Sequence, residues 1–332
     1  MDQTIQYEDA SVTLETLDSG KTRLKVEPNS DDKIFIPERF CETTYPIDLI
    51  KSILDVKGPA YLCDEILREE SPTYLQKNIE YDLLSYVDKD DFKGKRILEL
   101  GSGSGASTTI MARLFPDSEI IGVELEDRNL SIARHRAKYY NLKNVTFLLS
   151  PNSNELPKDL GEVDYITLNA VYEHLLPAER KALLPALWNT LKPNGVIFIR
   201  ETPYRYRFLE GHTTGLKLIN FLPDKVAHLY ANKFSKRNHE NDSWDELLRK
   251  GIRGGSVKEI TGILEECKGD AALLDPIAPG IQDRIDLAYA KNNNLKLTKL
   301  RSRLRYSALK LFKTLTGVQY VASLALAIRK ES

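Results

Sequence analysis

The chain has few cysteines and no long apolar run. Its 332 residues include three cysteines, Cys41, Cys63 and Cys267, which are scattered and odd in number. This pattern argues against a disulfide framework or a zinc site and favours a reducing compartment. No stretch approaches the roughly 18 apolar residues that span a bilayer, and the N-terminus has no basic, apolar and small-residue signal for secretion. We therefore expect a cytoplasmic protein.

The net charge of −1 conceals an uneven distribution. Residues 1–199 hold 23 Lys and Arg against 33 Asp and Glu, a net of −10, whereas residues 200–332 hold 24 against 15, a net of +9. Two interpretations stay open: the basic half attracts an anionic acceptor, or the two halves simply pair. Because no block of basic and aromatic residues forms a stacking platform, we expect no nucleic-acid partner.

An apolar strand leads into a glycine-dense turn at residues 97–105, which read Ile-Leu-Glu-Leu-Gly-Ser-Gly-Ser-Gly. A predicted helix begins at Ala106 and ends at Phe115, just before Pro116. Glycine tolerates positive φ and lets the backbone come close to a ligand. A second apolar strand ends on Glu124, whose carboxylate can accept hydrogen bonds from the two hydroxyls of a ribose. The two features together predict a cofactor that contains a ribose.

The identity of the cofactor depends on Glu99, because the glycine loop also satisfies the loose dinucleotide fingerprint. Glu99 lies two residues before Gly101, inside the strand. There a carboxylate can meet the amino group of a methionine moiety but would repel a pyrophosphate. This position favours S-adenosylmethionine over a nicotinamide. A Glu99→Gln substitution should separate the two, since it would weaken S-adenosylmethionine binding and leave nicotinamide binding nearly unchanged.

Residues 95–201 resemble the class I S-adenosylmethionine-dependent methyltransferases. The sequence motifs of this family occur in the family's order. They are the glycine loop at 99–105, the acidic end of the second strand at 122–124, the fourth strand with its turn at 163–175, and the fifth strand with its turn at 191–201. The resemblance implies an α/β fold, a doubly wound, seven-stranded and mostly parallel sheet. N-terminal helices would precede the sheet, and a cap would be inserted after strand five.

The resemblance also implies where the cofactor binds. After the third strand, residues 144–149, family members often carry an Asp that holds the adenine, and here Asn152 or Ser153 takes its place. The predicted cofactor-binding residues are Glu99, Gly101, Ser102, Gly103, Gly105, Glu124, Leu125, Asn152, Ser153 and Asn169.

The chain is expected to divide into four segments. Residues 1–92 form an N-terminal lead, with a hairpin around Ser19-Gly20, and a helical cap. Residues 93–201 form the cofactor-binding core, 202–255 a substrate-specificity insert, and 256–332 the C-terminal completion of the sheet, with strands at 271–278 and 318–328.

A basic amphipathic helix is predicted within residues 299–315. Leu300, Leu304, Leu311 and Leu315 form a stripe along it, and its other faces carry Lys and Arg. Such a stripe commonly packs on the protein's own sheet. The alternative is a peripheral contact with an anionic membrane surface, which would fit a lipid-linked glycan acceptor.

Methyl transfer to an alcohol needs a group that removes a proton, and His is suited to this because its ordinary pKa lies near ~6.5. Among the five His, His174 and His212 are the candidates, with Glu201 at the end of the fifth strand as a partner or alternative base. For His174 a structural role, in which it pins the turn, stays open. The Glu173-His174 pair resembles one in ubiquinone-pathway O-methyltransferases. In part of that group the pair binds a divalent metal together with an acid three residues earlier. Because that position is Ala170 here, we predict no metal.

The insert is rich in aromatic, basic and His residues and follows a strand tip. We predict substrate contacts from Tyr204, Arg205, Arg207 and Thr213, the alternative being that the aromatic rings only pack the insert on the sheet. The sequence therefore predicts O-methylation of a small or saccharide-like, anionic acceptor, as in polysaccharide biosynthesis. N-methylation of an amine, nicotinamide-dependent oxidoreduction and a non-catalytic cofactor-binding role stay open, and the oligomeric state is not predicted.

Overall fold

The computed structural model describes residues 3–29, 38–293 and 297–331. The chain forms two compact units, one made of residues 1–79 and 102–149, the other of residues 80–101 and 150–332.

The first unit contains a four-stranded antiparallel sheet. Its strands, in order across the sheet, are β1 (Gln3–Gln6), β2 (Ala10–Thr16), β3 (Thr22–Pro28) and β4 (Phe40–Thr43). Successive strand residues point to opposite faces, so β2 and β3 direct Val12, Leu14 and Leu24 into the core. Gly20 takes a φ of +79° in the turn between them. The predicted hairpin around Ser19-Gly20 is confirmed.

Two helices pack on this sheet. Leu49, Ile53 and Leu54 form one buried face of the first helix, which joins the core of the sheet. The elements that follow β4 are α1 (Ile47–Lys57), α2 (Pro59–Glu70), the π-helical turn η1 (Pro72–Gln76) and α3 (Lys77–Leu84), which continues into the second unit.

The rest of the first unit alternates helix and strand. Helix α4 ends just before Phe115 and Pro116, where a proline would remove a helical hydrogen bond, so the predicted helix is confirmed. The elements are α4 (Ala106–Leu114), β6 (Glu119–Glu124), α5 (Asp127–Tyr139) and β7 (Val145–Leu149), with β6 and β7 parallel.

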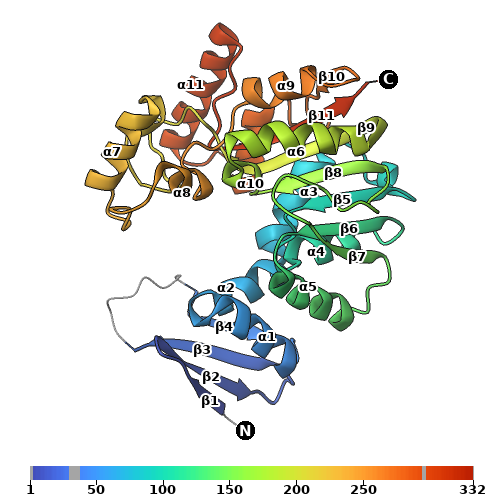
Figure 1. The fold of residues 1–332 in the computed structure, drawn as a ribbon, viewed down its shortest axis with the longest axis vertical. Coiled ribbons are helices and arrows are strands. Elements are labelled where there is room, and N and C mark those ends of the chain that lie inside the picture. The colour runs from blue at the N-terminus through green and yellow to red at the C-terminus, as the bar shows by residue number, and fades with distance from the viewer. Residues whose placement is uncertain (1–2, 30–37, 294–296, 332) are drawn as a thin grey trace. The chain divides into compact units, whose positions relative to one another are not determined.

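The second unit is built on neighbouring paired strands, and helix α6 lies along them (Figure 1). The strands are β5 (Arg96–Leu100), β8 (Val163–Asn169), β9 (Leu191–Pro203), β10 (Ala271–Leu273) and β11 (Ser323–Lys330). β5, β8 and β9 are parallel, whereas β11 is antiparallel to β9 and β10 to β11. The parallel strands are buried on both faces, which explains their continuous apolar runs.

Helices and short turns connect these strands. They are η2 (Lys89–Phe92), η3 (Tyr172–His174), α6 (Pro177–Thr190), η4 (Ile219–Phe221), α7 (Asp224–Phe234), α8 (Trp244–Arg249), α9 (Val257–Glu265), α10 (Arg284–Asn293) and α11 (Leu300–Thr316). In the insert, α7 and α8 share a small core around Ala227, Ala231 and Leu247. No helix in the described part of the chain is both long and apolar enough to cross a bilayer.

The sheet has seven strands in the order β10-β11-β9-β8-β5-β6-β7. The predicted α/β class with a seven-stranded, mostly parallel sheet is confirmed, since the pairs β6–β7, β5–β8 and β8–β9 are parallel and β11 is antiparallel to both β9 and β10.

Three local predictions need correction. The seventh strand, predicted over 318–328, covers Ser323–Lys330 and so begins five residues later than predicted. The sixth strand, predicted over 271–278, covers only Ala271–Leu273, because Pro276 lacks the N–H that a longer ladder would need. The leucine stripe of α11 is predicted to pack on the sheet, yet α11 contains no buried residue. Its leucines face away from the unit to which the helix belongs.

Candidate active site

The glycine loop and Glu124 meet in the first unit. The backbone N–H of Gly103 donates to Glu124 Oε2 at 2.7 Å, and Glu124 Oε1 accepts from the N–H groups of Leu125 at 2.9 Å and Glu126 at 3.2 Å. The carboxylate at the tip of β6 therefore holds the loop that precedes α4. Of the predicted cofactor residues, Gly103, Glu124 and Leu125 are brought into direct contact.

Close packing requires glycine at Gly105. This residue caps α4 with a φ of +79°, and a Cβ there would lie 2.5 Å from the Cβ of Ala133. Nearby, Ser102 is buried, and its Oγ has no hydrogen-bond partner among the described residues. An unpartnered buried hydroxyl beside a glycine loop fits a polar ligand that would supply the missing bond. The loop therefore suits a ribose-containing cofactor.

The other predicted cofactor residues lie in the second unit. Glu99 is fully buried within β5, and a Cβ on Gly101 would lie 2.5 Å from Val171 Cγ2. Asn169 ends β8, and its Oδ1 is buried without a partner among the described residues.

The two predicted adenine contacts already have partners in the same unit. Asn152 Oδ1 accepts from the N–H of Asn154 at 2.8 Å, and the Ser153 side chain hydrogen-bonds to the Glu179 carboxylate. Their side chains would have to give up or share these bonds to hold the adenine.

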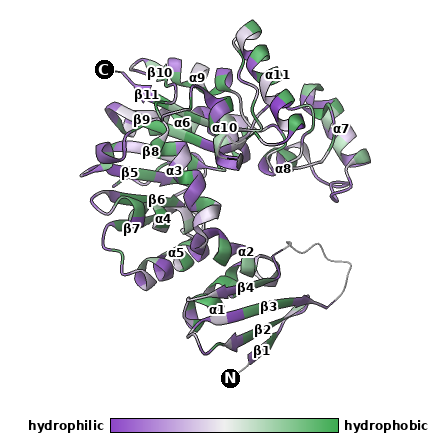
Figure 2. Ribbon diagram, turned by 180° about the vertical axis from the view of Figure 1, so that it is seen from behind, coloured by the Kyte–Doolittle hydropathy of each residue, from purple (hydrophilic) through white to green (hydrophobic). Residues whose placement is uncertain are grey.

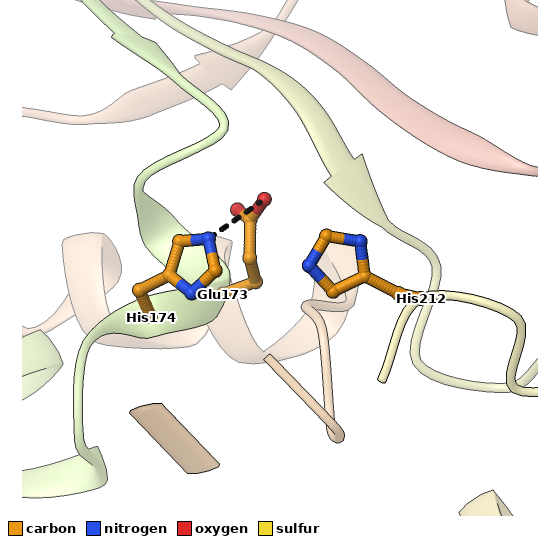
Figure 3. A group of neighbouring side chains, drawn as sticks. All are labelled: Glu173, His174 and His212. Atoms are coloured by element: carbon orange, nitrogen blue, oxygen red, sulfur yellow. Dashed lines mark ion pairs between the residues drawn. The ribbon is translucent and has the colours of Figure 1, made fainter. Parts of the chain in front are cut away.

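A cluster of Glu173, His174 and His212 lies just beyond β8 (Figure 3). Each side chain can offer one ligand atom, and these atoms lie within 4.8 Å of one another. Glu173 comes from η3 and is fully buried, while His212 comes from the loop of the insert. The structure thus brings together the two predicted His candidates and adds a carboxylate between them.

The hydrogen bonds of Glu173 and His174 leave two atoms of the cluster available. Glu173 Oε2 accepts from Thr202 Oγ1 at 2.9 Å, but Oε1 has no hydrogen bond within the described structure and lies 3.8 Å from His174 Nε2. His174 Nδ1 lies 2.7 Å from the carbonyl oxygen of Arg249. Since a carbonyl only accepts, Nδ1 carries the hydrogen, and Nε2 faces the cluster.

The surroundings shift two pKa values in the cluster. Burial raises the pKa of Glu173, more than the nearby His174 and the Thr202 hydrogen bond lower it. Burial, and after it the charge of His174, lowers the pKa of His212 below its usual range. The lowered pKa favours the neutral imidazole of His212, which is the form that accepts a proton.

The position of His212 depends on Glu210, a residue that no motif in the sequence singles out. Glu210 is buried and accepts from the N–H groups of His212 and Thr213, each at 2.8 Å, and from that of Thr214. Thr213 Oγ1 in turn donates to the Lys250 carbonyl at 2.7 Å. Thr213, predicted to bind substrate, thus uses its hydroxyl to secure the insert.

Glu201 belongs to a different group of charges. Its carboxylate pairs with Lys291 Nζ at 2.5 Å, and Lys291 also binds Asp82, which pairs with buried Arg200. Burial tends to raise the pKa of Glu201, but the charge and hydrogen bond of Lys291 outweigh it and lower the pKa overall. An ionised carboxylate held by a lysine is a weak base, so the geometry favours the His pair over Glu201.

The remaining predicted substrate residues lie close to His212 within the insert. Tyr204, Arg207 and His212 line one small pocket. Tyr204 is buried and stacks edge-on against Tyr206 and Tyr320. The Arg205 guanidinium donates to the Asn220 carbonyl, and burial, followed by the charge of Arg253, lowers its pKa to about 10. Packing thus explains Tyr204, whereas Arg207 borders a pocket of about 10 Å³, which has room for about one water molecule.

The cluster also has the composition of a metal site. One carboxylate and two imidazoles are ligands that Zn²⁺ and related ions accept. The sequence-based prediction of no metal relied on Ala170, which takes the place of an acid. His212, which is remote in sequence, supplies a third ligand that spacing alone did not reveal. The absence of a metal stays a prediction.

The opposite pKa shifts of Glu173 and Glu201 predict opposite effects on stability. The native state holds the Glu173 proton more tightly than the unfolded chain does, so its contribution to the free energy of unfolding falls as the pH rises above the ordinary carboxyl pKa. Glu173→Gln should therefore raise the free energy of unfolding, relative to the parent, by more at pH 8 than at pH 4. The difference is about 1.4 kcal/mol for each tenfold increase in the proton affinity of this carboxyl on folding. Chemical denaturation at both pH values measures this difference.

Glu201→Gln is the matched control, because the lowered pKa of Glu201 stabilises the fold above the ordinary carboxyl pKa and loses that effect on acidification. This variant should be less stable than the parent at pH 8. If both variants lost stability equally at both pH values, the ionised form of Glu173 would not destabilise the fold, and the prediction would be wrong.

Comparison with known proteins agrees with this geometry. Residues 91–251 match a family described as a methyltransferase domain. A ubiquinone biosynthesis O-methyltransferase of Acinetobacter baumannii is 26% identical over 185 residues, which are 54% of this chain and 72% of the relative. A carboxy-S-adenosyl-L-methionine synthase of Nautilia profundicola is 26% identical over 143 residues, which are 43% and 58% of the two chains.

Among solved structures, an S-adenosylmethionine-dependent methyltransferase from Clostridium acetobutylicum is 19% identical, with a TM-score of 0.38, over 47% of this chain and 60% of its own. The family match over residues 91–251 agrees with the strand order and with the glycine loop. Residues 91–251, just under half of the chain, therefore match a methyltransferase domain, and S-adenosylmethionine is the cofactor that this match supports.

Proposed function

We propose that the protein transfers the methyl group of S-adenosylmethionine to a hydroxyl oxygen of a small or saccharide-like, anionic acceptor, in the cytoplasm and within polysaccharide biosynthesis. The observation that carries this proposal is the cluster of Glu173, His174 and His212 just beyond β8. When bound, S-adenosylmethionine would supply an activated methyl group: an O–C bond would form in line as the C–S bond breaks, with S-adenosylhomocysteine as the leaving group. The protein must then position the acceptor and remove its proton.

His212 is the base in this proposal. Its pKa is lowered, so the neutral imidazole can take the hydroxyl proton near neutral pH. His174 has its Nδ1 fixed by the Arg249 carbonyl, and it presents Nε2 to the same space. Glu173, whose Oε1 lacks a hydrogen bond among the described residues, would stabilise the imidazolium that forms on His212. The three groups together suit removal of a proton from an alcohol.

The preference for an anionic acceptor rests on arginines of the insert. Arg207 lines the same small pocket as His212. Arg253 lines it as well, but its guanidinium already pairs with Asp224 at 2.6 Å, so Arg207 is the arginine that supports this preference. Arginine forms paired hydrogen bonds with carboxylate and phosphate oxygens. The net charge of +9 over residues 200–332, from 24 basic and 15 acidic residues, would attract such a group. One relative, the ubiquinone biosynthesis O-methyltransferase, supports oxygen as the accepting atom.

A second candidate mechanism uses a divalent metal on the same three residues, because their ligand atoms lie within 4.8 Å of one another. In that case Glu173, His174 and His212 would hold the ion, and the ion would favour the ionised form of the acceptor hydroxyl. The acceptor would be the same, but His212 would act as a ligand and not as a base.

The test supplies the full chain with S-adenosylmethionine that carries a labelled methyl group. The acceptors are a sugar phosphate, the same sugar without phosphate, a catechol and an amino-sugar phosphate. We expect label on an oxygen of the sugar phosphate, at a rate at least tenfold above that of the neutral sugar. Label confined to nitrogen, or a rate indifferent to the acceptor's charge, would contradict the proposal.

A chelator distinguishes the two mechanisms in the same assay. Activity that survives EDTA supports the His212 base. Activity that EDTA abolishes and Zn²⁺ restores supports the metal.

A further inference from the structure

Helix α11 (Leu300–Thr316) exposes its apolar face. Leu300, Leu304, Leu311 and Leu315 are 70%, 64%, 60% and 75% exposed. At 100° per residue these four leucines lie within one narrow arc of the helix. Figure 2 shows hydrophobic positions alternating with hydrophilic ones along α11. A face of this kind normally packs on the protein that carries it, and here it does not.

The opposite side of α11 is held to the second unit by charges. Lys310 Nζ lies 2.7 Å from Asp283 and 2.9 Å from Asp286, and Lys313 Nζ lies 2.7 Å from Asp283. Tyr306 adds a hydrogen bond of 2.7 Å to Asp286. These partly buried contacts fix the rotation of the helix about its axis. The outward direction of the leucines is therefore a consequence of specific ion pairs.

The charge of α11 restricts what can cover its leucines. Residues 299–316 contain six basic residues and no acidic one. Lys310 and Lys313 are paired, but Lys299, Arg301, Arg303 and Arg305 form no ion pair with a carboxylate of the described residues. A second copy of the same helix would bring like charges together, which disfavours self-association. An anionic surface that also accepts apolar side chains matches both properties.

We propose that α11 docks the protein on an anionic lipid surface. The four leucines enter the boundary between headgroups and acyl chains, and Arg301, Arg303 and Arg305 bind lipid phosphates. The insert offers a second exposed apolar region at Tyr206, Phe208 and Phe221. Phe208 is tied to the segment after α11 by its N–H, which donates to Tyr320 Oη at 3.1 Å. Docking through α11 does not depend on the identity of the acceptor.

Co-sedimentation of the full chain with vesicles tests the proposal. One set contains phosphatidylcholine only, and the other adds phosphatidylglycerol. We expect binding to the anionic set that weakens in high salt. The triple variant Arg301→Gln/Arg303→Gln/Arg305→Gln should bind about 100-fold more weakly, because each basic residue near such a surface contributes about 1 kcal/mol. The double variant Leu304→Glu/Leu311→Glu should lose binding entirely.

The matched control is Tyr61→Glu, which places a charge on a side chain that is 53% exposed on α2. It should bind the vesicles like the parent. Binding of S-adenosylhomocysteine by each variant shows that the fold is retained. The proposal is overturned if the parent fails to bind, if it binds neutral vesicles equally well, or if the leucine variant keeps its affinity. It is also overturned if sedimentation velocity shows that these leucines form a dimer.

Discussion

Glu124→Ala is expected to weaken the binding of S-adenosylhomocysteine by at least about 100-fold. Glu124 would hold two ribose hydroxyls, and a hydrogen bond to a charged group contributes about 1.5–3 kcal/mol. The carboxylate also accepts the Gly103 N–H at 2.7 Å, so its removal releases the glycine loop as well. Calorimetric titration of the variant and the parent measures the change in Kd.

Glu15→Ala provides the control for this measurement. Glu15 is a partly exposed carboxylate of the same unit and pairs with Arg23 at 3.0 Å. Its removal should leave the Kd unchanged. The Kd of Glu124→Gln should lie between those of the parent and of Glu124→Ala. If Glu124→Ala bound S-adenosylhomocysteine as tightly as the parent does, Glu124 would not be part of the cofactor site.

His212→Asn should lower kcat by about 100-fold to 10,000-fold, the range typical of a lost general base. The Kd for S-adenosylhomocysteine should not change, because the role assigned to His212 is toward the acceptor. Since burial and His174 lower the pKa of His212, the parent should keep its activity down to below about pH 6.5, the ordinary pKa of His. This acid limb should vanish in the variant. Rates measured across the acid, neutral and mildly alkaline range test both statements.

His228→Asn is the matched control, because His228 bonds to the Asp242 carbonyl at 2.7 Å and is not part of the cluster. It should retain most of the parent's kcat. If His212→Asn left kcat and the pH profile unchanged, neither base nor metal-ligand chemistry could be assigned to His212.

Local sequence pattern accounts for much of the fold. The buried run at Ile97–Leu100 and the turn at Ser19-Gly20 each follow from residues adjacent in the chain. The contact between the glycine loop and Glu124 was also predictable, because a turn after one strand meets the tip of a neighbouring strand. These features depend on propensity and on a motif whose parts lie close in sequence.

The rest of the site depends on contacts between distant residues. His212 lies near Glu173 because buried Glu210 accepts hydrogen bonds from the N–H groups of the loop. Residue spacing in the sequence does not predict this arrangement. Lys291, which is distant from Glu201 in sequence, forms an ion pair with it. This pairing makes Glu201 a poor candidate for the base. In α11, the pairing of Lys310 and Lys313 with Asp283 decided the rotation of a helix whose leucine stripe alone predicted inward packing.

Parallel calorimetric titrations of the parent protein with S-adenosylhomocysteine, S-adenosylmethionine and NAD test the central claim most directly. The glycine loop, Glu124 and the methyltransferase domain of residues 91–251 predict saturable binding of the first two and none of NAD. Binding of NAD alone would contradict the account and assign the loop to a dinucleotide.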